Sequence, residues 1–197
     1  TNLLKRDGGL DAAEASIARL ALDALVVIGG DDTLSVAAGL AKRGAAVVAV
    51  PKTMDNDVWG TEGCLGFDTA ANIVTEALDR IQTTTSSHHR VAVVEVMGRD
   101  AGWVAAWGGL AGGADAILVP ESPIDSVAID RLVDLVTRRR SYATGASVIV
   151  VSEGVQLPEA LLNLSGDVPR DEFGHPRLDK IAVGDAIAAI LEERTGL

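Results

Sequence analysis

The sequence alternates between short runs of β-branched residues and longer segments in which apolar residues recur at helical spacing. Strand-like runs occur at residues 25–28, 46–50, 91–97, 116–119 and 148–151. Helix-like segments occur at residues 11–22, 33–43, 68–82, 103–111, 126–140 and 178–193. This alternation is typical of βαβ units. It predicts an α/β fold with three layers, doubly wound around a mainly parallel sheet, in which ligands bind beyond the carboxyl ends of the strands.

Length and charge narrow the class of protein further. The 197 residues are enough for one substantial α/β domain but not for two comfortable ones. With 17 basic and 28 acidic side chains the net charge is −11, which argues against nucleic acid or an anionic membrane as partner. The single Cys64 excludes an internal disulfide. With no membrane-spanning apolar run and no secretory leader, we expect a cytoplasmic protein.

The first strand-like run is followed by Gly29-Gly30-Asp31-Asp32-Thr33, which leads into a helix. Two glycines allow a tight turn and close approach of a ligand, and a helix N-terminus offers N–H groups to an anion. Carboxylates facing a phosphate need a cation between them, so Asp31 and Asp32 predict Mg²⁺. The alternative is that one of these two acids only caps the helix.

The second strand-like run is followed by a polar segment. We expect Pro51 to end the strand and residues 51–66 to form a long loop. In an extended segment residues spaced by two face the same way, so Asp55 and Asp57 are expected to point into one cleft. Lys52 adds a positive charge suited to a phosphate. The alternative is a solvated polar turn.

Two further strand ends carry similar residues. Met97-Gly98-Arg99 follows the third run, where Gly98 allows close approach and Arg99 can bind a phosphate or carboxylate through two donors. Glu153 follows the last run and can accept hydrogen bonds from sugar hydroxyls. Taken together, the four strand ends predict phosphoryl transfer from a magnesium-bound donor to a hydroxyl.

Six ordered motifs resemble the 6-phosphofructokinase family, and the resemblance spans essentially the whole chain. They are Gly29 to Thr33, Pro51 to Asp57, Gly66-Phe67-Asp68-Thr69-Ala70, Ser86-Ser87-His88 with Arg90, Met97-Gly98-Arg99 and Ser152-Glu153-Gly154. On the donor side, the resemblance implies that Asp31 is the magnesium ligand and Asp55 the base that removes a proton from the sugar 1-hydroxyl. It implies supporting roles in catalysis for Lys52, Thr53 and Asp57. The phosphate-donor site would comprise Gly30, Asp32, Thr33 and Lys52.

On the sugar side, the resemblance implies that fructose 6-phosphate contacts Met97, Gly98, Arg99 and Glu153. Arg90 matches an arginine that reaches the sugar phosphate of an adjacent subunit. That role requires an oligomer, so we expect a homo-oligomer, either a dimer or a tetramer.

Two positions bear on the phosphoryl donor. ATP-dependent members usually have glycine where this chain has Asp32, and many also have glycine in place of Lys52. The acidic side chain disfavours the α-phosphate of ATP, whereas Lys52 would neutralise pyrophosphate. The combination resembles the pyrophosphate-dependent type, whose reaction is reversible and serves glycolysis and gluconeogenesis; the ATP-dependent type is the alternative. Lys52, Arg90, Arg99 and Mg²⁺ would concentrate positive charge at the strand ends.

Residues 1–197 match the catalytic region of the family without its N-terminal strand, which has its own glycine-rich turn, and without its C-terminal substrate loop. We therefore expect an incomplete segment with little or no activity in isolation. An inactive fragment or a non-catalytic regulatory subunit of the same fold is the alternative of another class. A lipid or NAD kinase also carries a similar glycine-acid turn but lacks the motif from Pro51 to Asp57.

Overall fold

The computed structural model describes residues 3–141, 145–158, 161 and 182–197. The chain divides into two compact units, Thr1–Asp68 and Thr69–Leu197. The strands form two three-stranded parallel sheets rather than the single sheet expected from the sequence. The local pattern of a buried parallel strand does not specify its partner, because its apolar run looks the same in either sheet.

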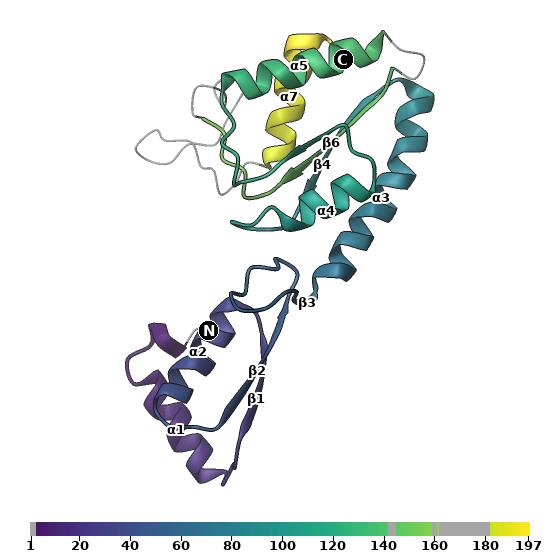
Figure 1. Ribbon diagram of the computed structural model, residues 1–197. Coiled ribbons are helices and arrows are strands. Elements are labelled where there is room, and N and C mark those ends of the chain that lie inside the picture. The colour runs from purple at the N-terminus through teal and green to yellow at the C-terminus, as the bar shows by residue number, and fades with distance from the viewer. Residues whose placement is uncertain (1–2, 142–144, 159–160, 162–181) are drawn as a thin grey trace. The chain divides into compact units, whose positions relative to one another are not determined.

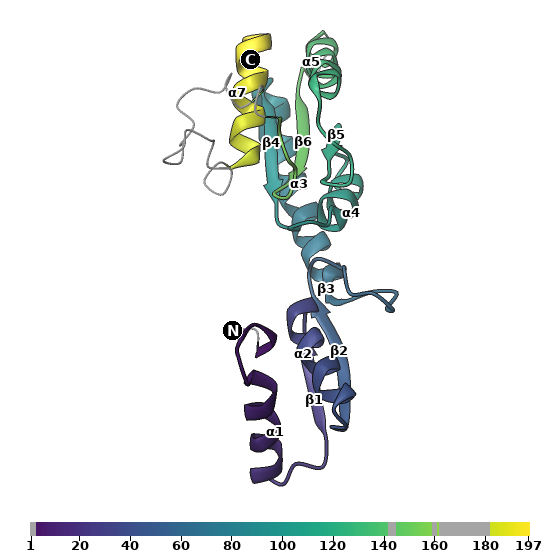
Figure 2. The same cartoon turned by 90° about the vertical axis from the view of Figure 1, so that its left-hand side faces the viewer.

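The first unit is built on one short parallel sheet. Its elements are the 3₁₀ helix η1 (Leu3–Lys5), α1 (Gly9–Arg19), β1 (Leu25–Gly29), α2 (Asp31–Lys42), β2 (Val47–Thr53) and β3 (Leu65–Gly66). The strand order is β1-β2-β3. Helix α2 packs along β1 and β2, and α1 packs against α2 (Figure 2). Arg43, just after α2, forms exposed ion pairs with Asp11 and Glu14 of α1.

Strand β2 continues through Pro51, so the predicted strand end there was wrong. Pro51 stands in register with Gly29 of β1, and Lys52 and Thr53 pair onward with β3. A proline lacks the N–H donor but keeps its carbonyl acceptor, so a strand tolerates it where that donor is not needed. The irregular segment begins at Met54, not at Pro51.

Helices of residues 3–68 cover only one face of this sheet. Val27 of β1 lines a cavity together with residues of α2. Residues on the opposite face alternate with it, and Val26, Ile28 and Val48 are 67%, 59% and 60% exposed. These side chains form an apolar face without a covering element among the described residues of the first unit.

The second unit contains the remaining elements. They are α3 (Phe67–His88), β4 (Val91–Val96), α4 (Trp103–Ala111), β5 (Ala116–Leu118), α5 (Ser126–Arg140), β6 (Ser147–Ser152) and α7 (Val183–Thr195). The strand order is β4-β6-β5, and both pairings are parallel. Helices α5 and α7 lie on one side of the sheet, and α3 and α4 lie on the other (Figure 1). The predicted three-layer arrangement is present here.

The central strand β6 is buried along its whole length. Ile149 and Val151 belong to the core cluster formed with α5 and α7. Val150 points to the other side, where Gly109 of α4 comes so close that a Cβ there would lie 3.4 Å from the Val150 Cβ. Both faces of the sheet are therefore packed by helices.

Helix α3 runs to His88, six residues beyond the predicted end at Gln82. The hydroxyl-rich sequence after Gln82 favours a helix end, because such side chains compete for backbone hydrogen bonds. Here the Thr85 hydroxyl donates to the carbonyl of Ile81 at 2.7 Å, one turn earlier, and so stays within the helix. Asp68 is the second residue of the helix.

The other predicted elements agree closely or fall partly outside the structure. Helices α4 and α5 begin and end at the predicted residues. The predicted loop 153–177 and the predicted helix start at residue 178 lie largely outside the described residues. Within the described ranges, no helix is both long enough and apolar enough to cross a bilayer.

Replacing Ile149 with alanine tests whether β6 anchors the second unit. Ile149 is 0% exposed, so Ile149→Ala should lower the free energy of unfolding by about 2–5 kcal/mol through lost burial and a cavity. Ile73→Ala is the matched control, since Ile73 of α3 is 61% exposed and should change stability by roughly 0.5 kcal/mol or less. Urea unfolding followed by tryptophan fluorescence measures both variants. Equal losses would show that β6 is not the anchor.

Candidate functional site

The turn after β1 leads directly into α2. The helix begins at Asp31, two residues earlier than predicted, and its N-cap is Gly30 in an extended conformation. The Gly30 carbonyl accepts hydrogen bonds from Thr33 N and Leu34 N at 3.0 and 2.9 Å. The N-cap position is held by Gly30, so the alternative that one of the two acids is the N-cap is wrong. Asp31 and Asp32 lie in the first turn, where negative charge is favoured by the helix dipole.

The same turn passes close to the end of β2. A Cβ at Gly30 would lie 3.4 Å from the Thr53 Cβ and 3.7 Å from its hydroxyl oxygen. A Cβ at Gly29 would lie 2.5 Å from the Thr33 Cβ, so a side chain at Gly29 would displace the start of α2. Within the first unit, the predicted convergence of the two strand ends is therefore confirmed.

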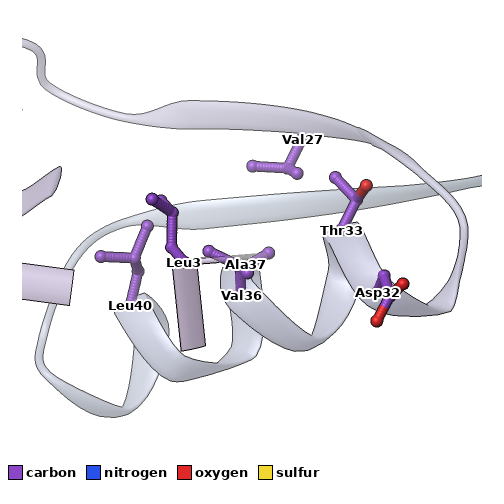
Figure 3. A pocket seen from close by; sticks show the side chains of 7 residues that line it. All are labelled: Leu3, Val27, Asp32, Thr33, Val36, Ala37 and Leu40. Atoms are coloured by element: carbon purple, nitrogen blue, oxygen red, sulfur yellow. The ribbon is translucent and has the colours of Figure 1, made fainter. Parts of the chain in front are cut away.

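A cavity of about 280 Å³ lies beside this helix start (Figure 3). Its lining residues are Leu3, Val27, Asp32, Thr33, Val36, Ala37 and Leu40. Figure 3 shows Asp32 and Thr33 together on the first turn of α2, while the remaining side chains are aliphatic. The lining contains neither lysine nor arginine, so a phosphate bound at the Asp32 end needs positive charge from outside the cavity.

Lys52 and Asp55 sit at the end of β2 and just beyond it. Lys52 is exposed, whereas Asp55 is half-buried. The Thr53 hydroxyl oxygen accepts a hydrogen bond from Asp55 N at 3.2 Å and lies 3.4 Å from the Asp55 Oδ2 carboxylate oxygen, to which it donates. Thr53 thus holds both the backbone and the carboxylate of Asp55.

The segment after Asp55 is not extended. The prediction that Asp55 and Asp57 point into one cleft because they are spaced by two residues was therefore wrong in its premise. Asn56 has a φ of +54°, in the left-handed region. An alternation of side chains requires extended backbone, so the spacing of Asp55 and Asp57 does not make them face the same way. Asp57 is exposed, in contrast to the half-buried Asp55.

Asn56 itself was missed by the sequence analysis. Its side-chain oxygen accepts a hydrogen bond from Cys64 N at 2.9 Å, and Cys64 is buried. Asparagine adopts the left-handed region more readily than most residues, and this was the available signal. Asn56 therefore sets the turn after Asp55 and ties the loop to the start of α3.

In the second unit, the ends of β4 and β6 come together as predicted. Glu153 Oε1 accepts hydrogen bonds from the backbone N–H groups of Gly98 and Arg99, each at 3.2 Å. Met97 and Arg99 are exposed, whereas Gly98 is buried. The expected role of Glu153 toward sugar hydroxyls stays a prediction, and one of its oxygens already serves the backbone.

Arg90 lies at the other end of the same strand. It precedes β4, and its carbonyl accepts a hydrogen bond from Ser147 N at 3.2 Å. Strand β4 has six residues, so Arg90 and Met97 are separated by roughly 20 Å along the sheet. Within one chain, Arg90 therefore lies away from Arg99, and its expected role toward the sugar phosphate of an adjacent subunit stays a prediction.

The described residues contain no group of three or more histidine, cysteine, aspartate or glutamate side chains placed to hold a metal ion. Mg²⁺ commonly uses only one or two carboxylates and completes its shell with phosphate oxygens and water. Asp31 and Asp32, both exposed in the first turn of α2, supply carboxylates of that kind. The donor set fits Mg²⁺ held jointly with a phosphate and does not fit a closed protein site.

Comparison with known proteins identifies the family of the chain. The family model described as Phosphofructokinase matches residues 1–197. The chain belongs to the phosphofructokinase family. The resemblance on which the sequence analysis relied is thus confirmed, and so is the phosphofructokinase-like α/β fold.

Relatives in this phosphofructokinase family include users of both donors. A pyrophosphate–fructose 6-phosphate 1-phosphotransferase of Amycolatopsis methanolica is 48% identical over 198 residues, which cover 100% of this chain and 55% of that protein. An ATP-dependent 6-phosphofructokinase 2 of Streptomyces coelicolor is 44% identical and covers 98% of this chain and 56% of its own length. The chain thus spans about half the length of these relatives.

Among solved structures, the crystal structure of a pyrophosphate-dependent phosphofructokinase from Nitrosospira multiformis matches with a TM-score of 0.75 and 25% identity. The match covers 98% of this chain and 47% of that one. A pyrophosphate-dependent phosphofructokinase from Marinobacter aquaeolei matches with a TM-score of 0.74 and 26% identity, covering 95% and 45% of the two chains.

The buried Cys64 thiol reports on the Asn56 anchor, because Cys64 is the single cysteine of the sequence. Asn56→Gly keeps the left-handed turn but removes the acceptor for Cys64 N, and should speed labelling of Cys64 by a disulfide reagent about fivefold. Asn56→Ala also strains the turn and should label faster still. Asn56→Asp keeps an acceptor and should label at the native rate, as should the control Asp57→Asn. Equal rates for all variants would contradict the anchor.

Proposed function

We propose that the protein containing this chain transfers a phosphoryl group from pyrophosphate to the 1-hydroxyl of fructose 6-phosphate, giving fructose 1,6-bisphosphate reversibly. The observation that carries this proposal is the 48% identity, over the whole chain, to a pyrophosphate–fructose 6-phosphate 1-phosphotransferase. Two further relatives of the same name, from Amycolatopsis mediterranei and Streptomyces coelicolor, are 48% and 46% identical. Such a reaction would serve glycolysis and gluconeogenesis.

The donor side of the reaction is assigned to the first unit. The N-cap of α2 is Gly30, which brings no side chain of its own to the helix start, and this favours a phosphate at this end of the helix. Lys52, exposed at the end of the adjacent strand, supplies the positive charge that the cavity lining lacks. Asp32 adds negative charge in the same first turn. This charge repels the additional phosphate group by which ATP differs from pyrophosphate, and so disfavours ATP as the donor.

The proposed base is Asp55. A general base must hold its carboxylate in a defined direction, within hydrogen-bond reach of the hydroxyl that it deprotonates. The Thr53 hydroxyl, 3.4 Å from the Asp55 Oδ2 atom, and the left-handed turn at Asn56 constrain the carboxylate from both sides. Asp57 is assigned a supporting role, which its exposure allows but which the spacing argument no longer supports.

Mg²⁺ is the proposed cofactor, with Asp31 as its protein ligand. When bound, the ion neutralises phosphate charge and aligns the donor for transfer. The chain's own contribution is to place the Asp31 carboxylate in the first turn of α2, directly after Gly30, whose backbone lies close to Thr53.

The sugar side is assigned to the second unit, with Met97, Gly98, Arg99 and Glu153 as contacts for fructose 6-phosphate. We also propose a homo-oligomer, a dimer or a tetramer, in which Arg90 serves the sugar phosphate bound by another subunit. The support is its exposed position at the amino end of β4, about 20 Å from the residues at the opposite end. A cytoplasmic location is proposed on the single, unpaired Cys64.

The second candidate is the ATP-dependent reaction on the same sugar. It is favoured by the 44% identical relative from Streptomyces coelicolor, which is named an ATP-dependent 6-phosphofructokinase. The aliphatic walls of the cavity beside α2 also suit an apolar group better than they suit a phosphate. An assay with pyrophosphate and with ATP as phosphoryl donor therefore decides between the two reactions.

Replacing the proposed base tests the mechanism. Asp55→Asn keeps the size of the side chain but removes its basicity, and should lower kcat by about 10²–10⁴-fold with a smaller change in KM. The measurement is the rate of fructose 1,6-bisphosphate formation by the full-length product of the gene, with Asp79→Asn, an exposed acid on α3, as control. Native kcat in Asp55→Asn would remove Asp55 from the mechanism.

Exchange of Asp32 tests the choice of donor. Asp32→Gly removes the carboxylate from the first turn of α2, and should raise kcat/KM for ATP by roughly tenfold or more while lowering that for pyrophosphate. Asp79→Asn again serves as the charge-matched control. If the wild type uses ATP better than pyrophosphate, or if Asp32→Gly gains nothing with ATP, the electrostatic argument for pyrophosphate fails.

A further inference from the structure

We infer that Glu121 is a positioning residue for Arg99, acting with Glu153 as a carboxylate clamp on the loop of residues 97–102. This inference rests on the proposed function of Arg99 as a contact for the sugar phosphate. It goes further by assigning a role to Glu121, which lies beyond the end of β5 and belongs to none of the motifs in the sequence.

The loop needs such support because its backbone is strained. Arg99 has a φ of +44°, in the left-handed region that residues with a side chain rarely adopt. This conformation costs about 1–2 kcal/mol and persists only where the surroundings enforce it. A short bond from Ala101 N to the Gly98 carbonyl, at 2.7 Å, closes the turn locally. That single bond leaves the two ends of the loop to be held by other groups.

Two carboxylates hold those ends. Glu153 Oε1 accepts from Gly98 N and Arg99 N, both at 3.2 Å. Glu121 Oε1 accepts from Gly102 N at 2.9 Å. Hydrogen bonds to an ionised acceptor are about twice as strong as neutral ones. Glu153, just after β6, thus binds the start of the loop, and Glu121, after β5, binds its last residue.

The backbone of the loop is packed tightly against the segments that hold it. A Cβ at Gly102 would lie 2.5 Å from the Val119 Cβ and 2.6 Å from Glu121 Oε2. A Cβ at Gly154 would collide with the Arg99 carbonyl oxygen. The loop therefore sits directly on the segments that follow β5 and β6, and a shift at Gly102 is transmitted to Arg99 three residues earlier.

The clamp uses its carboxylates on the backbone and leaves the Arg99 side chain for a ligand. Arg99 is exposed, and its guanidinium makes no hydrogen bond or ion pair with the described part of the chain. Its direction is set by its own backbone, because no side chain of these residues holds it. Glu121 is exposed as well, so removing its carboxylate opens no core. Its loss should change the placement of Arg99 far more than the stability of the unit.

The test compares Glu121→Ala, Glu121→Gln and Glu193→Ala in the full-length enzyme, with fructose 6-phosphate and pyrophosphate as substrates. Glu121→Ala should raise KM for fructose 6-phosphate about tenfold, with the KM for pyrophosphate unchanged. Glu121→Gln keeps an acceptor for Gly102 N and should recover most of that loss. Glu193 is an exposed acid on α7 and should behave as wild type. In the Arg99→Ala background, Glu121→Ala should add little, because both act through one side chain.

A second measurement is independent of activity. Amide hydrogen exchange in the peptide covering residues 97–102 should quicken in Glu121→Ala and stay native in Glu193→Ala. Unchanged exchange overturns the clamp, whatever the kinetics. Faster exchange with an unchanged KM for fructose 6-phosphate overturns the positioning role. If the wild type does not phosphorylate fructose 6-phosphate at all, the proposed function fails, and the exchange experiment still decides whether the clamp exists.

Discussion

The parallel pairing of β4 with β6 is the interaction on which the proposed sugar site depends. The two strands are in register along six residue pairs, from Val91 with Ser147 to Val96 with Ser152. Because both strands end at the same level, Gly98 and Arg99 emerge beside Glu153, and a single carboxylate oxygen can bind both of their N–H groups. A shift of the register by one residue would turn the Glu153 side chain to the other face of the sheet and break this contact.

Many of the acidic side chains in this chain have a structural role. With a net charge of −11, the chain carries more carboxylates than its lysines and arginines can pair. Several of them bind backbone N–H groups instead. Asp125 caps α5 through Ala128 N, and Glu95 accepts from Gly184 N at the start of α7 at 2.7 Å. Such bonds place negative charge at helix starts and loop ends, where the backbone dipoles favour it.

The sequence predicted what depends on local chemistry. The glycines that follow the first and third strands located the Gly30 turn and the Arg99 loop, and helical spacing located α4 and α5 to the residue. It could not predict the division into two sheets, since strand partners are chosen by tertiary packing. It also missed the continuation of β2 through Pro51, because whether a missing N–H matters depends on the neighbouring strand.

Two backbone conformations that the sequence did not predict share a physical cause. Asn56 and Arg99 have φ values of +54° and +44°, and each adjoins or is a residue assigned to the chemistry. A positive φ leaves no mark on hydrophobic periodicity, and the groups that hold these turns come from outside them, Cys64 for Asn56 and Glu121 for the Arg99 loop. In both places, the strain fixes a direction that a relaxed loop would leave free. The polar side chains that hold these turns are therefore those that accept hydrogen bonds from backbone N–H groups outside their own local segment.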